Sequence, residues 1–184
     1  MGSCIKLYTQ IIFGIGLTFG HTTQIYARFE FTNLECVAID KAFGIFDYCY
    51  LKSVNRTYKY ASAKYLPLQV PINNIVLKIE LMKRLNGYKP FLYNISFDYC
   101  RFMRNPNSGN KVETFFLSLV QPYTNVNHTC PYSEFLLVDK LPISFLDYKL
   151  TKILPLPEGD YRVQGIAVVS GIKRAYVNTY FRIF

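Results

Sequence analysis

Apolar and polar residues alternate along most of the chain from residue 29 onward. In the clearest segment, 75–83, one face carries Ile75, Leu77, Ile79 and Leu81. The next segment, 91–99, repeats the pattern with Phe91, Tyr93, Ile95 and Phe97. Because successive side chains of a strand point to opposite faces, both segments predict strands with one buried face. Asn86-Gly87 lies between them and predicts a hairpin turn, since both residues tolerate positive φ.

Weaker alternation predicts further strands at 29–36, 43–51, 58–66, 161–170 and 174–183. The first two flank Asp40-Lys41 and predict a hairpin, and the last two predict a hairpin around Gly171. About seven strands, many with one apolar face, favour an antiparallel sandwich over an α/β fold.

One segment has the period of a helix. Its apolar stripe consists of Val112, Phe115, Phe116, Leu119 and Val120, and this spacing predicts one short helix. Ser108 or Asn110 is a suitable N-cap, and Pro122 follows the stripe. The apolar, proline-punctuated segment 141–157 shows neither period, so we expect an irregular crossing loop. The fold class expected from the residues is therefore mostly β, an antiparallel β-sandwich with one short helix.

The N-terminal residues resemble a secretory signal. Lys6 is followed by the apolar run 11–19, which is about half as long as a bilayer-spanning helix. We expect a signal peptide at 1–23, cleaved between residues 20 and 27, and a single domain at 24–184. The expected location is extracellular, with no membrane span.

The cysteine count agrees with export. Of five cysteines, Cys4 lies in the expected leader, and the other four allow three pairings. We expect Cys36 to pair with Cys49 across a short turn, and Cys100 with Cys130 around the predicted helix. Zinc sites favour closely spaced Cys-x2-Cys pairs, which the chain lacks, so we expect no metal.

Sequons for N-glycosylation begin at Asn55, Asn94 and Asn127. Their presence fits a secreted protein, and each sequon predicts that its asparagine side chain faces solvent.

The charge is strongly positive, with 21 basic and 12 acidic residues. Loss of Lys6 with the leader changes the net charge from +9 to +8, since 21 − 1 − 12 = 8. The basic residues form several groups, one of which contains Lys52, Arg56, Lys59 and Lys64. Because the chain is expected outside the cell, this charge favours solubility and acidic partners, and we expect no nucleic-acid partner.

Catalytic chemistry finds little support. The chain has two His residues; His21 lies near the expected cleavage site and His128 within a sequon, a poor setting for a hydrolase triad. The carboxylates show no recognisable pairing for glycoside hydrolysis, and no glycine-rich phosphate loop lies outside the leader. We therefore expect no enzyme activity and no cofactor.

Aromatic residues are abundant, with 16 Tyr and 15 Phe. They can fill the core of a sandwich, or they can line a ligand cavity between splayed sheets. Composition does not separate these alternatives.

Four motifs resemble a large insect family of small secreted proteins of unknown function, known as domain of unknown function 1091. They lie at 49–58, 83–93, 127–132 and 156–161. The family is related to chemosensory-B-type proteins and to ML lipid-recognition domains. The resemblance implies an immunoglobulin-like, ML-type sandwich that holds a hydrophobic ligand, and some relatives are implicated in contact-pheromone sensing.

The leading hypothesis is a secreted, non-enzymatic carrier of a hydrophobic small molecule such as a lipid or pheromone. The expected cavity residues are Ile75, Leu77, Ile79, Leu81, Phe91, Tyr93, Ile95, Phe97, Phe115, Phe116 and Leu119. The alternative hypothesis is an extracellular interaction module that binds a receptor through its basic, glycosylated surface. Charge reversal at Lys52 and Arg56 would test that alternative.

Overall fold

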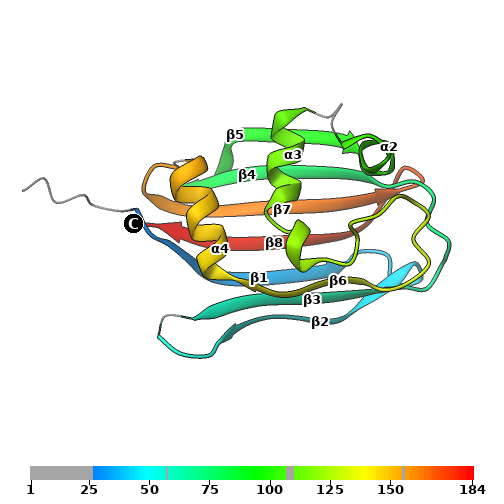
Figure 1. Ribbon diagram of the computed structural model, residues 1–184, viewed down its shortest axis with the longest axis horizontal. Coiled ribbons are helices and arrows are strands. Elements are labelled where there is room, and N and C mark those ends of the chain that lie inside the picture. Colours follow the sequence, from blue (N-terminus) through cyan, green and yellow to red (C-terminus); the bar gives the residue numbers. More distant parts are fainter. Residues whose placement is uncertain (1–26, 57, 107–109, 155) are drawn as a thin grey trace, which may run out of the picture.

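Two antiparallel sheets form the protein, as Figure 1 shows for the computed structural model. The structure describes residues 27–56, 58–106, 110–154 and 156–184. The expected signal peptide, 1–23, and most of its cleavage window lie outside these residues. The described part is mostly β, with a few short helices, which confirms the predicted fold class.

The larger sheet has five strands in the order β1-β8-β7-β4-β5. Their bounds are β1 Phe29–Ala38, β4 Val76–Leu85, β5 Gly87–Asp98, β7 Gly159–Val169 and β8 Ile172–Ile183. Gly87 has a φ of +88° in the β4–β5 turn, and Gly171 has a φ of +79° in the β7–β8 turn. Both predicted hairpins are confirmed by the pairing of these strands.

The smaller sheet has three strands in the order β2-β3-β6. Their bounds are β2 Gly44–Ser53, β3 Lys59–Pro67 and β6 Leu136–Pro142. The sequence pattern did not reveal β6, because its short apolar run ends in the proline-rich segment and does not alternate.

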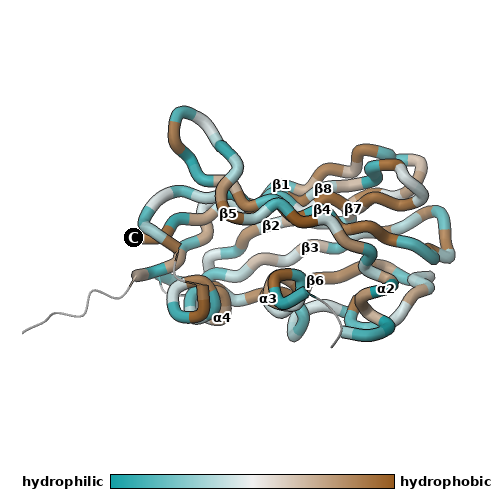
Figure 2. Tube along the Cα trace, turned by 90° about the horizontal axis from the view of Figure 1, so that it is seen from above, coloured by the Kyte–Doolittle hydropathy of each residue, from teal (hydrophilic) through white to brown (hydrophobic). Residues whose placement is uncertain are grey.

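The helices lie on one side of the five-stranded sheet. Figure 2 shows this sheet along one side of the molecule, with β6 and the α-helices along the other. The helices are α2 Tyr99–Arg104, α3 Lys111–Ser118, η2 Gln121–Tyr123, α4 Ile143–Tyr148 and η3 Lys149–Ile153. The predicted helix corresponds to α3, where the side chain of Asn110 accepts a hydrogen bond from the Val112 N–H and caps the first turn.

The predicted hairpin between 29–36 and 43–51 is wrong. Strand β1 pairs with β8, and β2 pairs with β3, so the intervening turn carries the chain from one sheet to the other. Asp40 sets this turn, because its carboxylate accepts hydrogen bonds from the backbone N–H groups of Ala42 and Phe43. The Cys36–Cys49 disulfide consequently joins the two sheets.

The predicted irregular loop at 141–157 is also wrong, since the chain there forms the end of β6, then α4 and η3. Leu146 and Leu150 are buried one turn apart in this helical stretch. Asp147 anchors the stretch to the large sheet by accepting a hydrogen bond of 2.7 Å from the Phe29 N–H. The proline residues on both sides of the helical stretch 143–153 obscured its spacing.

The core differs between the two ends of the sandwich. The filled end, near α4 and the C-terminus, contains a buried cluster that includes Phe29, Phe31, Leu81, Tyr161 and Phe181. The rings of Tyr161 and Phe181 are stacked with their centroids 5.4 Å apart. The hollow end, near α2 and the β7–β8 turn, contains a second cluster and the cavity described next.

Candidate functional site

An apolar cavity of about 420 Å³ lies between the sheets at the hollow end. Strands β2, β3, β4, β6, β7 and β8 contribute to its walls, together with α2, α3 and residues 120–132. Small-molecule pockets typically measure about 300–1,000 Å³ and are lined mostly by apolar side chains. In its size and lining, the cavity is suited to a small apolar molecule.

Small side chains on the inner face of the large sheet create the space. Along β7 the inward positions change from Tyr161 at the filled end to Gly165 and Ala167 at the hollow end. Ala167 pairs with Ala175 of β8, so two small side chains lie next to each other in the sheet. A Cβ atom added to Gly165 would meet no atom within 4 Å. The cavity therefore follows from the order of residue sizes along β7 and β8.

Aromatic side chains of α2 and of the segment 124–132, which follows η2, form another part of the wall. The hydroxyl groups of Tyr99 and Tyr132 both donate to the carbonyl of Val126, at 2.6 and 3.0 Å. Burial raises the pKa of both hydroxyls, which keeps them protonated as donors. The Cys100–Cys130 disulfide adds a covalent link between α2 and the same loop. These bonds join α2 to residues 126–132 in one part of the wall.

The rim of the cavity lies between α2, α3 and η2. Four lining residues there are exposed to solvent, namely Pro106, Thr114, Gln121 and Asn127. The Gln121 side-chain N–H donates to the side-chain oxygen of Asn127 at 2.9 Å, across part of this rim. The rim is thus more polar than the interior and provides a route from solvent.

The predicted cavity residues divide between the two ends. Ile75 and Leu77 line the cavity. Phe97 is buried beside it, with its ring 5.8 Å from that of Phe102. None of the other predicted residues lines the cavity. They belong to the core cluster of the filled end or pack against it: Ile79, Leu81, Phe91, Tyr93, Ile95, Phe115, Phe116 and Leu119.

Sequence reasoning missed most of the lining because it took the cavity residues from two strands and one helix, whereas much of the lining comes from β2, β3, β6, α2 and residues 120–132. A hollow also requires small residues on an inward face, and 165, 167 and 175 provide them. That signal is present in the sequence as Gly165 and Ala167, at two successive inward positions of a predicted strand. These small residues are informative because Tyr161 lies on the same face of the strand. The change from a large to a small side chain marks where the filled core ends.

The disulfides and sequons occupy the positions expected of them. Cys36 pairs with Cys49, and Cys100 with Cys130. The side chains of Asn55, Asn94 and Asn127 are all exposed. Attachment of glycans stays a prediction.

The basic surface is partly neutralised within the chain. Lys59 forms an ion pair with Glu30, and Lys64 with Asp47. Lys52 and Arg56 are exposed at the end of the small sheet. Receptor binding through these two residues stays a prediction.

Within 27–56, 58–106, 110–154 and 156–184, no group of three His, Cys, Asp or Glu residues is arranged to hold a metal ion. None of the helices in these ranges has the length and apolar character needed to cross a membrane.

The chain is similar to one protein family and to solved structures. Residues 77–163 match a family described as "Protein of unknown function (DUF1091)", which is the family that the sequence motifs resemble. No curated protein sequence matches the chain. One similar solved structure is that of a Niemann-Pick type C2 protein from the Japanese carpenter ant, with 13% identity and a TM-score of 0.32. The alignment covers 82% of this chain and 96% of the ant protein.

Proposed function

We propose that the protein is a secreted, non-enzymatic carrier of a hydrophobic small molecule held in the cavity of the hollow end. The observation that carries the proposal is the apolar space of about 420 Å³ between the sheets, with Gly165 and Ala167 on its wall. A chain selected only for stability would gain by filling this space, because apolar voids forfeit packing contacts.

Two features support an extracellular setting. The two disulfides require an oxidising compartment to form and persist. The N-terminal apolar run and the three exposed sequon asparagines agree with passage through a secretory pathway. A role in chemical sensing is a further proposal that comes from the family resemblance.

Filling the cavity tests the function. Gly165→Phe places a ring where a new Cβ meets no atom within 4 Å, so the fold should persist. Removing glycine from a strand should also stabilise the protein slightly, by about 0.5–1 kcal/mol. We expect the variant to lose at least about 10-fold in affinity for the fluorescent apolar probe N-phenyl-1-naphthylamine, which corresponds to about 1.4 kcal/mol.

The matched control is Ile166→Phe, which adds an aromatic ring at the adjacent position of β7, on the opposite face of the sheet. It should bind the probe as the unaltered protein does. Equal binding by Gly165→Phe and the unaltered protein would place the probe elsewhere and contradict the proposal. Native mass spectrometry of the secreted protein provides a second measurement, because a retained apolar molecule at one-to-one stoichiometry should disappear in Gly165→Phe.

A further inference from the structure

One of the sequon asparagines is also a lining residue of the cavity. Asn127 begins the sequon that ends at Thr129, and it belongs to the cavity wall. Asn127, His128 and Thr129 are all exposed. Neither Asn55 nor Asn94 lines the cavity. A glycan at position 127 would therefore be attached to the wall of the candidate binding site, whereas glycans at the other two positions would be attached elsewhere.

Asn127 lies where the cavity meets solvent. Four described lining residues are exposed, and all of them belong to the rim between α2, α3 and η2: Pro106, Thr114, Gln121 and Asn127. The other described lining residues are buried or half-buried. We therefore expect a ligand that enters from solvent to pass this rim.

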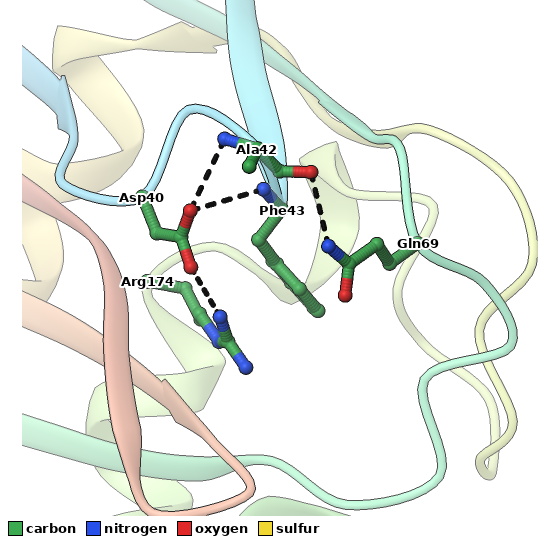
Figure 3. Close-up of polar contacts among 5 residues, drawn as sticks. All are labelled: Asp40, Ala42, Phe43, Gln69 and Arg174. Atoms are coloured by element: carbon green, nitrogen blue, oxygen red, sulfur yellow. Dashed lines mark hydrogen bonds and ion pairs between the residues drawn. The ribbon is translucent and has the colours of Figure 1, made fainter.

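Another corner of the cavity is closed by polar contacts. Figure 3 shows Asp40 between Arg174 and the backbone N–H groups of Ala42 and Phe43. The Arg174 guanidinium carbon lies 4.4 Å from the centre of the Phe43 ring. The Gln69 side chain donates to the Ala42 carbonyl at 3.1 Å, which ties residues after β3 to the same turn. Phe43 is 5% exposed and the Arg174 side chain 13% exposed, so this corner offers a ligand no open route.

The chain on both sides of Asn127 is held in place. The carbonyl of Val126, the preceding residue, accepts hydrogen bonds from the hydroxyl groups of Tyr99 and Tyr132 at 2.6 and 3.0 Å. Cys130, three positions after the asparagine, is fixed to α2 by its disulfide. A group attached to Asn127 consequently stays beside the opening.

The amide group of Asn127 is placed in a way that is compatible with glycosylation. Its side-chain oxygen accepts the hydrogen bond of 2.9 Å from Gln121, so the amide nitrogen is not used in that bond. In N-glycosylation this nitrogen forms a bond with the anomeric carbon of a lipid-linked oligosaccharide. The bond between that carbon and the pyrophosphate of the donor breaks, the lipid pyrophosphate leaves and the amide loses one proton. The product keeps the side-chain oxygen, and with it the bond to Gln121.

We infer that Asn127 carries an N-linked glycan that covers part of the rim and slows the entry and exit of the ligand. Such glycans are bulky and hydrophilic, so the sugar stays in water rather than entering the apolar cavity. It obstructs the same opening in both directions, and it therefore changes the rates of binding without changing the affinity. This inference rests on the proposed function, because it concerns access to the same cavity.

Thr129→Ala tests the inference, because it abolishes the sequon and retains Asn127 with its hydrogen bond to Gln121. Intact-mass spectrometry of the protein secreted by eukaryotic cells should show the loss of one glycan. Stopped-flow fluorescence with N-phenyl-1-naphthylamine should show that the association and dissociation rate constants both rise by at least about 3-fold, with an unchanged Kd.

Two matched variants serve as controls. Thr129→Ser keeps the sequon, so it should retain both the glycan and the slow rates. Ser96→Ala removes the sequon of Asn94, which does not line the cavity, and should lose a glycan without changing the rates. Trimming the unaltered protein with an endoglycosidase that leaves a single sugar should raise the rates as Thr129→Ala does, and it requires no change in the folded chain.

The possible failures are distinguishable. An unmodified Asn127 in the secreted protein would overturn the inference, and so would unchanged rates in Thr129→Ala or an equal rise in Ser96→Ala. In each of these cases, binding of N-phenyl-1-naphthylamine leaves the carrier function standing. If the probe binds neither the unaltered nor the trimmed protein, the proposed function fails and the inference fails with it.

Discussion

The filled and hollow ends are built from the same strands, yet they differ in what their inward positions contribute. At the filled end, Tyr161 of β7 pairs with Phe181 of β8, and both are at most 2% exposed. At the hollow end, Ala167 of β7 pairs with Ala175 of β8. The register of β7 on β8 is unbroken from Tyr161 to Ala167, so the difference along this stretch lies in side-chain volume. The comparison shows that one sheet can carry a filled core at one end and a cavity at the other.

The two ends also differ in how they are held. The filled end relies on ring packing, since Phe181 contacts both Phe29 and Tyr161 at centroid distances of 5.0 and 5.4 Å. The hollow end has fewer apolar atoms to pack, and it is reinforced by the Cys100–Cys130 disulfide and by hydrogen bonds to Val126. Covalent and polar links maintain a space that apolar packing alone would tend to close.

The largest effect is expected from removing a ring at the filled end. Phe181→Ala should lower the free energy of unfolding by about 3–5 kcal/mol, because it loses the burial of the ring and leaves a cavity between Phe29 and Tyr161. Chemical denaturation measures the change. A loss below about 1 kcal/mol would mean that this end is not tightly packed, which would remove the basis of the comparison.

Removal of the second disulfide should have a slightly smaller effect and act on the hollow end. The double variant Cys100→Ala/Cys130→Ala opens a loop with a sequence separation of 30 and should lose about 3–4 kcal/mol in the chain-entropy model. Amide hydrogen exchange should increase in residues 120–132. The control, Cys36→Ala/Cys49→Ala, should leave exchange in that loop nearer to its original rate, and equal exchange in both variants would contradict a local role.

Two leucines on β4 provide a direct comparison of the ends. Leu81 is 1% exposed in the filled cluster, whereas Leu77 borders the cavity. Leu81→Ala and Leu77→Ala remove the same atoms. The Leu81 side chain is packed on all sides, so its substitution loses more packing contacts. Thermal or denaturant unfolding should show that Leu81→Ala costs about 1–2 kcal/mol more than Leu77→Ala. The opposite order would indicate that the hollow end is packed as well as the filled end.

Acid should reduce stability through three paired carboxylates, and this is the smallest effect. Hydrogen bonds to Lys59, Arg174 and Arg182 lower the pKa values of Glu30, Asp40 and Asp160 below their ordinary values of 4.5, 3.8 and 3.8. A lowered pKa stabilises the fold above the ordinary value, and the stabilisation is lost as the pH falls through the folded-state pKa.

Measuring the free energy of unfolding between pH 6 and pH 2 tests this dependence. We expect this free energy to begin to fall at about pH 4.5. Asp160→Asn should have a shallower decline because it removes one of the three groups. An Asp160→Asn profile parallel to that of the unaltered protein would show that the pairing with Arg182 has no effect on stability.

Local patterns predicted many of the elements but gave no information on which strands pair across the sandwich. The Asn86-Gly87 turn, the capped α3 and the β7–β8 hairpin depend on contacts close in sequence, so they were readable. The pairing of β1 with β8 joins residues more than a hundred positions apart, and the turn at Asp40 gave no sign that it crosses between sheets. Strand β6 and helix α4 were missed because their apolar residues follow no clean period.

By itself, the sequence determined the class of fold and the solvent-facing sequons, whereas it left three cysteine pairings open, of which the structure has the expected one. These properties follow from period, spacing and local chemistry, which act over short distances. Tertiary structure decided which residues come together around the space. Tyr65, Arg174 and Gly165 come from three strands, and nothing in their local sequence brings them together. The small residues Gly165, Ala167 and Ala175 lie side by side in one sheet, and the space above them forms because the other sheet and α2 pack over that region.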